Sequence, residues 1–233
     1  MAATTRDLEA PATAIVTGSE LVTITQWQAR AWEHAITAAY HPDDPPPLHG
    51  WNPTGQHGAP VGYDLVLATP RTVSAVGWCF FSTDRGVSDD IMRANHQAAQ
   101  DVAVEFSVAI GAETPVMVSH LFDSAGQPWL HVHVVCGALA RPQRPGWSGP
   151  PRQDEVWLPL DPARVVRMAE RLIFGYHLLV RRTLTPMLRE LGLNWTRLAE
   201  DGSCEVWGLT VPMLACIAEP AQPLGEIHAC QVE

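Results

Sequence analysis

The sequence contains no lysine. All fifteen of its basic residues are arginines, and with 25 acidic residues they give a formal net charge of −10. Sequence-independent binding to nucleic acid draws most of its affinity from cations placed on phosphates. The charge balance therefore argues against that class of protein.

The sequence also lacks any CxxC pair. Its five cysteines are an odd number and lie far apart, at Cys79, Cys136, Cys204, Cys216 and Cys230. Disulfide frames and zinc knuckles need closer or paired spacings. We therefore expect free thiols in a reducing compartment.

Long apolar runs are missing as well. No run reaches the ~18 to 20 residues of a membrane-spanning helix, and the N-terminal segment lacks the basic start and apolar stretch of a signal peptide. We expect a cytoplasmic protein without a membrane partner. With 233 residues, 46% of them hydrophobic, the chain is predicted to form a single domain over residues 21–233 behind a flexible arm at residues 1–20.

Helical and strand-like segments alternate along the chain. Helices are predicted where apolar residues recur every three or four positions: residues 25–36, residues 91–109 behind a cap at Ser88, and residues 163–191 behind a cap at Asp161, with a bend or break at Pro186. Strands are predicted over residues 62–69, 116–120, 129–135, 194–198 and 204–209.

The order of these segments predicts an α+β fold in which an antiparallel sheet lies under helices. Asp123-Ser124-Ala125-Gly126 is a good turn sequence and joins two of the strands into a hairpin. Proline-rich residues 42–60 and 142–151 are predicted to be loops.

Three histidines form the candidate functional site. They have the spacing His120-x10-His131-x-His133. Residues two apart on a strand face the same side of a sheet, so His131 and His133 project together and His120 completes the set from the other strand of the hairpin. Imidazole is the commonest metal ligand, so we predict a metal site here rather than buried structural histidines. Among the other histidines, His49 and His57 stay open as alternative ligands.

The region around this motif resembles a known family. Residues 62–74 read GYDLVLATPRTVS and are similar to the block G-[YF]-D-L-T-F-S-A-P-K-S-V-S of TrwC/TraI-type conjugative relaxases. The three histidines resemble the HUH motif of these proteins in residue type and spacing. The resemblance extends to Asn95-His96, residues 158–161 and residues 190–192, and so covers roughly residues 20–220.

The resemblance implies a central antiparallel sheet of about five strands with a divalent ion held over it by His120, His131 and His133. The aspartate that matches Asp64 orients a ligand histidine in this family and helps to deprotonate the nucleophile. We therefore assign Asp64 the catalytic role. A carboxylate beside a ligand imidazole fixes its tautomer and raises its basicity.

The family nicks single-stranded DNA with a tyrosine of its N-terminal segment. This chain has only three tyrosines, Tyr40, Tyr63 and Tyr176, and we therefore expect that the tyrosine-bearing segment has been lost. Tyr63 lies in the strand motif and Tyr176 in a late helix, which leaves Tyr40 as the alternative nucleophile. Without a tyrosine in place, nicking by the family mechanism cannot proceed.

Other departures make the surroundings of the metal more apolar. His120 is followed by Leu121-Phe122 where the family has polar residues, and Val132 stands where threonine is common. Arg71 replaces the lysine of the family block, which keeps the charge and changes its geometry. We expect Arg71, Phe122, Trp129 and Val132 to bind the substrate.

Three hypotheses follow, in this order of preference. The first is a repurposed metalloenzyme, of biosynthetic type, that acts on a small, partly apolar or aromatic molecule rather than on nucleic acid. The second is a DNA relaxase or single-strand binding protein that uses Tyr40, and the third is an inactive remnant of one. The expected cofactor is one divalent transition metal ion, with zinc, manganese, iron, nickel and copper all open.

Overall fold

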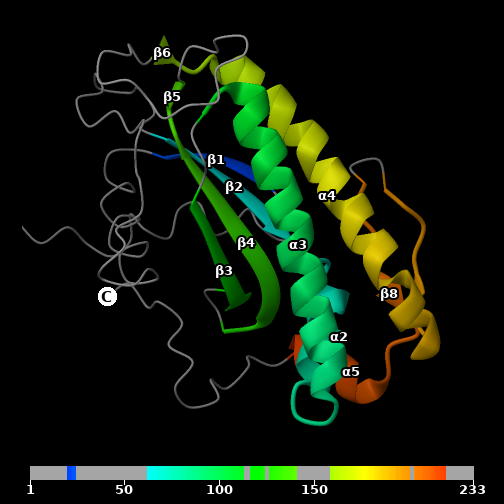
Figure 1. The fold of residues 1–233 in the computed structure, drawn as a ribbon. Coiled ribbons are helices and arrows are strands. Elements are labelled where there is room, and N and C mark those ends of the chain that lie inside the picture. The colour runs from blue at the N-terminus through cyan, green and yellow to red at the C-terminus, as the bar shows by residue number, and fades with distance from the viewer. Residues whose placement is uncertain are drawn as a thin grey trace, which may run out of the picture.

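The computed structural model describes residues 20–24, 62–112, 116–123, 126–140, 158–199 and 202–218. Its main sheet has the strand order β1-β2-β4-β3. The strands are β1 (Glu20–Ile24), β2 (Gly62–Ala68), β3 (Val116–Phe122) and β4 (Pro128–Gly137), and neighbouring strands are antiparallel (Figure 1). The α+β class and the antiparallel sheet are thus confirmed.

The expected number of about five strands was not met in the described part of the chain, where the sheet has four. The strand-like segments near the end of the chain pair with each other instead of joining it. They form a separate two-stranded sheet of β7 (Asn194–Trp195) and β8 (Val206–Trp207). A second small sheet consists of β5 (Leu139–Ala140) and β6 (Leu158–Pro159).

The predicted hairpin of β3 and β4 is present. The amide of Asp123 donates to the carbonyl of Gln127 (3.0 Å) and the amide of Gly126 donates to the carbonyl of Asp123 (2.9 Å). His120 lies directly opposite His131, and the register shifts between His120 and Phe122. The hairpin therefore sets the relative positions of the three histidines.

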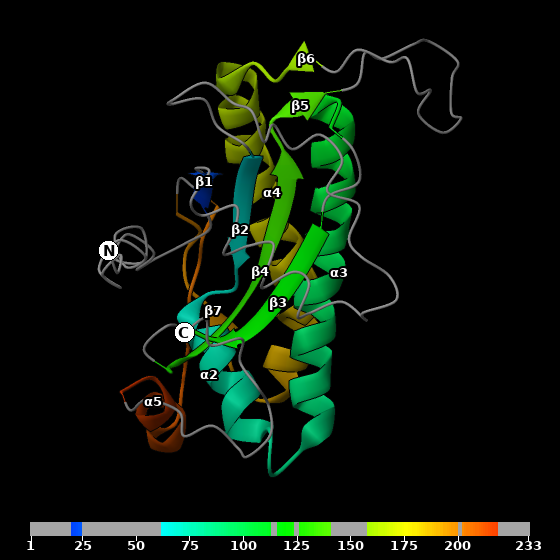
Figure 2. The same ribbon diagram turned by 90° about the vertical axis from the view of Figure 1, so that its left-hand side faces the viewer.

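Four helices are described: α2 (Arg71–Phe80), α3 (Arg85–Ile110), α4 (Pro162–Glu190) and α5 (Val211–Ala218). Figure 2 shows α3 and α4 side by side over one face of the sheet. Asp161 caps α4 as predicted, because its carboxylate accepts a hydrogen bond from the amide of Ala163 (3.0 Å). The helix continues past Pro186 as one element.

The predicted start of α3 was wrong. The cap is Asp84 rather than Ser88, and the Asp84 carboxylate accepts from the amide of Gly86 (3.1 Å). Both residue types cap helices well, and the earlier aspartate does so here. Ser88 lies inside the helix and is 2% exposed.

The core lies between the sheet and the two long helices. On the sheet it takes the odd-numbered residues of β2 and the even-numbered residues of β4, and on the helices Phe106 and Tyr176. Because side chains alternate along a strand, the histidines of β4 project from the opposite face.

Several sequence predictions fall outside the described residues: the flexible arm, the helix at residues 25–36, the two proline-rich loops, His49, His57 and Tyr40. Within the described part of the chain, no helix has the length and apolar character needed to cross a bilayer.

Candidate metal centre

Three imidazole rings meet on the sheet face away from α3 and α4. His120, His131 and His133 each offer one nitrogen, and these nitrogens all lie within 4.8 Å of one another. The three ring centroids are each 5.1 Å apart. The hairpin register produces this grouping, since His120 is paired with His131 across the strands.

Hydrogen bonds fix the tautomers of two rings. His133 Nδ1 lies 2.7 Å from Asp64 Oδ2, and His131 Nδ1 lies 2.8 Å from the carbonyl oxygen of Trp129. A carbonyl accepts only, as does an ionised carboxylate, so Nδ1 carries the proton in both rings. The lone pair of Nε2 is then left for a metal, which is the usual arrangement of ligand histidines.

The environment keeps two rings neutral. Burial, with a smaller effect of the neighbouring His133, lowers the pKa of His120 to about 4 and that of His131 to about 3. Nearby Asp64 opposes the shift at His120. Metal ligation needs the neutral form of imidazole. His120 and His131 are therefore available as ligands at pH 7, and the donor set fits a divalent transition ion.

Asp64 lies behind His133. It projects from β2, is 4% exposed, and belongs to the same sheet face as the histidines. Its Oδ2 accepts from His133, whereas its buried Oδ1 has no hydrogen-bond partner among the described residues. An unpartnered buried acceptor is costly unless something else donates to it.

Arg71 and Trp129 extend the site along the sheet. The Trp129 ring stacks on His131 with a centroid distance of 4.6 Å, and the Arg71 guanidinium lies 4.6 Å from the Trp129 ring centroid. Arg71 Nη1 also donates to Asp123 Oδ2 at 2.7 Å. Arg71, Trp129 and Asp123 therefore form one connected wall beside His131.

The other two expected substrate residues lie elsewhere. Val132 is fully buried and belongs to the core under the helices, because it alternates with the histidines along β4. The Phe122 ring packs edge-on against Trp78 of α2, with centroids 5.0 Å apart. The strand register shifts between His120 and Phe122, so Phe122 does not continue the alternation that places His120. The structure thus brings Arg71 and Trp129 to the histidines and does not bring Val132.

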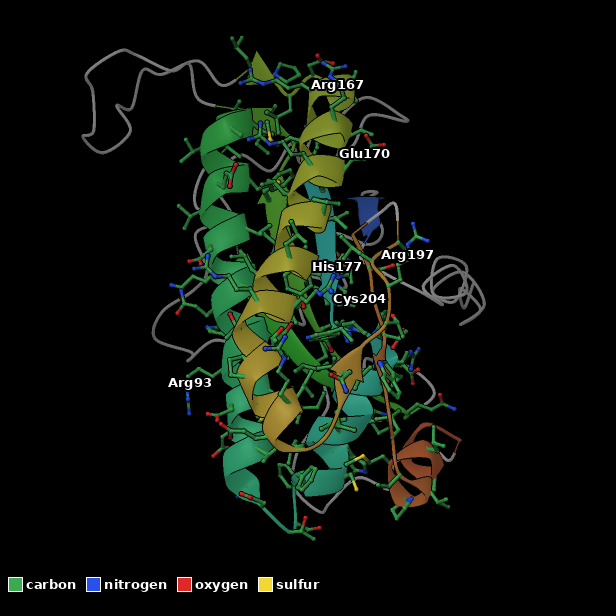
Figure 3. All side chains as sticks on the ribbon, turned by 90° about the vertical axis from the view of Figure 1, so that its right-hand side faces the viewer. Arg93, Arg167, Glu170, His177, Arg197 and Cys204 are labelled. Carbon is green, nitrogen blue, oxygen red and sulfur yellow. The ribbon has the colours of Figure 1, made fainter. Side chains whose placement is uncertain are left out.

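A small pocket adjoins Arg71 and Trp129, with further walls from residues that the sequence did not single out. They are His177 of α4 and the segment Ser203-Cys204-Glu205 before β8, and Figure 3 shows His177 and Cys204 close together. Burial raises the pKa of the Cys204 thiol. The Glu205 carboxylate accepts hydrogen bonds from the hydroxyl and the amide of Thr72 at the start of α2. No local sequence motif predicts that these residues line a pocket, because they come together only through contacts between distant parts of the chain.

Comparison with known proteins gives structural relatives only. No protein-family model matches the chain, and no curated protein matches it. The copper-bound structure of the conjugative relaxase TrwC in complex with OriT DNA is 16% identical over 70% of this chain and 57% of that chain, with a TM-score of 0.45. The metal-bound complex of TrwC is 15% identical over 94% of this chain and 78% of that chain, with a TM-score of 0.49.

The complex of TrwC with mutant OriT DNA is 15% identical over 91% of this chain and 75% of that chain, again with a TM-score of 0.49. The chain spans less than two thirds of the copper-bound relative. It is therefore similar in structure to a TrwC relaxase at low sequence identity, and it carries a three-histidine cluster.

Proposed function

We propose that this protein is a metal-dependent enzyme that uses His120, His131 and His133 to hold one divalent transition ion and acts on a small, partly apolar or aromatic molecule. The observation that carries the proposal is the pair of Nδ1 hydrogen bonds of His131 and His133. With the proton on Nδ1, both rings carry their lone pair on Nε2, and a third imidazole lies beside them.

A bound ion supplies Lewis acidity, which polarises an oxygen of the substrate or of water. The protein supplies the positions and the proton acceptor. Asp64 Oδ1 has no partner among the described residues, and we assign it the role of proton acceptor for a hydroxyl of the substrate or of water that binds next to it. Asp64 Oδ2 meanwhile holds His133 in its ligand tautomer.

The wall beside His131 supports a small substrate. Trp129 places an aromatic ring against His131, and the Arg71 charge is offset by Asp123 at 2.7 Å. A polyanionic strand would instead need several uncompensated cations and stacking side chains. The neighbouring pocket joins Arg71 and Trp129 to polar groups of Ser203 and Glu205, and with a volume of about 10 Å³ it is no larger than a water site.

Two hydroxamates test this proposal. Their chelating groups are alike, while benzohydroxamate carries a ring and acetohydroxamate carries a methyl group. Isothermal titration of the zinc-loaded protein should show tighter binding of benzohydroxamate, and Trp129→Leu should remove the difference because the aromatic ring beside His131 is lost. His131→Ala should abolish binding of both probes, since the metal is lost with its ligand.

Equal affinity for the two hydroxamates would contradict the small aromatic substrate. Competition by a single-stranded oligonucleotide would contradict it too, because it would show that the site holds nucleic acid. Hydroxamate binding that persists in His131→Ala would place the probe away from the histidines and remove the basis of the proposal.

The second candidate is a DNA relaxase. The histidine triad with Asp64 behind it favours this activity, since the sequence resemblance implies the same arrangement for relaxases. We predict no covalent adduct between the protein and single-stranded oligonucleotides in the presence of magnesium or manganese, because Tyr40 is the one candidate nucleophile among the three tyrosines of this sequence and it does not match the position of the family's tyrosine. A denaturing gel checks this. A shifted band that disappears in Tyr40→Phe would move the relaxase to first place.

A further inference from the structure

The outer surface of α4 carries a row of arginines and apolar side chains. Its exposed members recur every three or four positions and therefore share one face of the helix: Arg164, Arg167, Arg171, Phe174, Leu178 and Arg182. Phe174 and Leu178 are each 38% exposed. Among the described residues, Arg167 and Arg182 take part in no ion pair. An acidic and partly apolar surface would match this row.

The neighbouring helix α3 carries such a surface. Asp101, Val104 and Val108 recur at helical spacing on its outer side, with Glu105 beside them, and all four are exposed. Val104 is 58% exposed and Val108 is 65% exposed. The sequence has no arginine from residue 94 to the end of α3, so this half of the helix is negatively charged. Neighbouring exposed aliphatic side chains are typical of a contact surface.

Contacts between α3 and α4 place the two charged surfaces at the same level. Arg164 Nη2 donates to the carbonyl oxygen of Ala109, and Arg171 Nη2 lies 4.0 Å from Glu105 Oε1. The residue numbers rise along one helix as they fall along the other, so the helices run antiparallel. Figure 3 shows α3 and α4 side by side on this face, with Arg167 near the start of α4. The acidic half of α3 therefore lies beside the basic half of α4.

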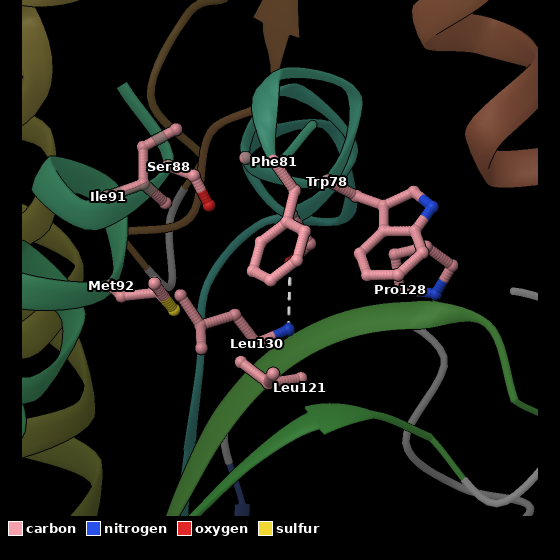
Figure 4. Close-up of a pocket in the computed structure, with 10 residues that line it drawn as sticks. Trp78, Phe81, Ser88, Ile91, Met92, Leu121, Pro128 and Leu130 are labelled. Carbon is pink, nitrogen blue, oxygen red and sulfur yellow. Dashed lines mark hydrogen bonds between the residues drawn. The ribbon is translucent and has the colours of Figure 1, made fainter. Parts of the chain in front are cut away.

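The inner sides of both helices are already occupied within the chain. The Tyr176 hydroxyl of α4 donates to Asn95 Oδ1 of α3, and both residues are buried. Figure 4 shows Ile91 and Met92 of α3 among side chains of α2 and the β3–β4 hairpin. The cavity that these residues line has a volume of about 30 Å³, which leaves room for little more than a water. The outer face is therefore the part of α3 and α4 on which a partner can dock.

We propose that this outer face binds a second copy of the chain, with α4 of each copy packed on α3 of the other. A twofold axis parallel to the helices produces this arrangement and keeps residues of the same level opposite each other. The arginines of α4 then face Asp101 and Glu105 of the second copy, and the exposed apolar side chains of both helices become buried.

Charge and size both favour a second copy. A nucleic acid or an anionic membrane would be attracted by the arginines of α4 and repelled by the carboxylates of α3, whereas a second copy pairs both. The helices have 26 and 29 residues. The face is thus about 40 Å long and about 20 Å wide, or ~800 Å² per copy, which is the size of a standard protein interface.

Sedimentation equilibrium of the whole chain over a dilution series tests the proposal. The wild type should approach twice its chain mass of 25.5 kDa as the concentration rises. Added salt should shift the equilibrium toward the monomer, because exposed charges are screened. His131→Ala should dimerise as the wild type does, because the histidines lie on the sheet face away from these helices. Dimerisation is thus tested separately from the proposed metal enzyme.

Two charge variants identify the contacting helices. Arg167→Glu with Arg171→Glu makes both helices acidic at this level, and Asp101→Arg with Glu105→Arg makes both basic. Each variant alone should be monomeric, because like charges then oppose each other across the interface. An equimolar mixture should form a heterodimer, because each acidic helix again faces a basic one. The heterodimer also shows that both variants are folded.

Two further variants complete the test. Arg85→Glu with Arg197→Glu changes the net charge as much as the acidic variant does, at exposed positions outside this face, and should leave the dimer intact. Val104→Ser with Val108→Ser changes no charge and should weaken the dimer at least about tenfold, because apolar burial is lost. This variant decides the question if a charge variant does not fold.

A wild type that stays monomeric at every concentration would overturn the proposal. So would a dimer that the charge variants and the valine variant all leave intact, or folded charge variants that form no heterodimer. Retention of a monomeric wild type on heparin through Arg167 and Arg171 would assign the face to a polyanion instead.

Discussion

Replacement of Asp64 tests how the protein orients its ligand histidines. Asp64→Asn keeps an oxygen that can accept from His133 Nδ1 and removes the charge, whereas Asp64→Ala removes both the acceptor and the charge. The present contact is 2.7 Å long and Asp64 is 4% exposed, so little water is available to replace it. Metal affinity should therefore fall in the order wild type, Asp64→Asn, Asp64→Ala.

The size of the effect follows from the number of ligands that lose their support. Only His133 loses an orienting bond, since His131 is held by the Trp129 carbonyl. Loss of one such partner typically costs 10- to 100-fold in metal affinity, which corresponds to roughly 1.4 to 2.7 kcal/mol. Asp64→Ala should lie toward the upper end, because it also leaves the ring free to change tautomer.

Competition with a chromophoric chelator measures the zinc affinity of each variant. Thermal unfolding of the metal-free proteins shows whether they remain folded. Asp101→Asn is the matched control, because Asp101 is an exposed carboxylate of α3 and its replacement changes the net charge equally. The reasoning is refuted if Asp64→Ala binds zinc as tightly as Asp101→Asn while both proteins are folded.

Two further predictions concern the histidines and their aromatic neighbour. The free energy of unfolding of the metal-free protein should decrease as the pH falls from about 6.5 toward 4, because the unfolded chain binds protons on His120 and His131 with the usual pKa of ~6.5 whereas burial holds their folded pKa values at about 4 and 3. Urea unfolding at pH 7 and pH 5 checks this, and unchanged stability would mean that the folded protein protonates these rings without cost. Binding of Cu²⁺ should quench part of the tryptophan fluorescence, because the Trp129 ring centroid lies 4.6 Å from that of His131. Trp129→Phe should keep copper affinity, since the carbonyl that orients His131 belongs to the backbone, and an undiminished quench in that variant would show that Trp129 is not the reporter.

The sequence predicted the parts of the site that depend on strand geometry. His131 and His133 share a face because their spacing is two, and a turn sequence ahead of β4 brings His120 opposite His131. The same alternation predicts that Val132 faces away, into the core. Placing Val132 among the substrate residues overlooked this consequence.

Other features depend on contacts that the sequence does not encode locally. The hydrogen bond between Thr72 and Glu205 joins residues 133 positions apart. The pocket beside them is lined by His177 and Cys204, which are also distant in sequence from Thr72. The separate sheet of β7 and β8 has the same origin: the local pattern indicates strands and does not say which partner each will take. The cap of α3 shows competition between two suitable residues, since Asp84 and Ser88 are both good caps.

The metal content of the purified protein tests the central claim most directly. Elemental analysis of protein prepared without added metal or chelator, and again after incubation with zinc and desalting, should give one divalent ion per chain after loading. His131→Ala should hold almost none, whereas His96→Ala, which removes an exposed histidine of α3, should hold as much as the wild type. A full complement of metal in folded His131→Ala, or none in the loaded wild type, would contradict the three-histidine centre.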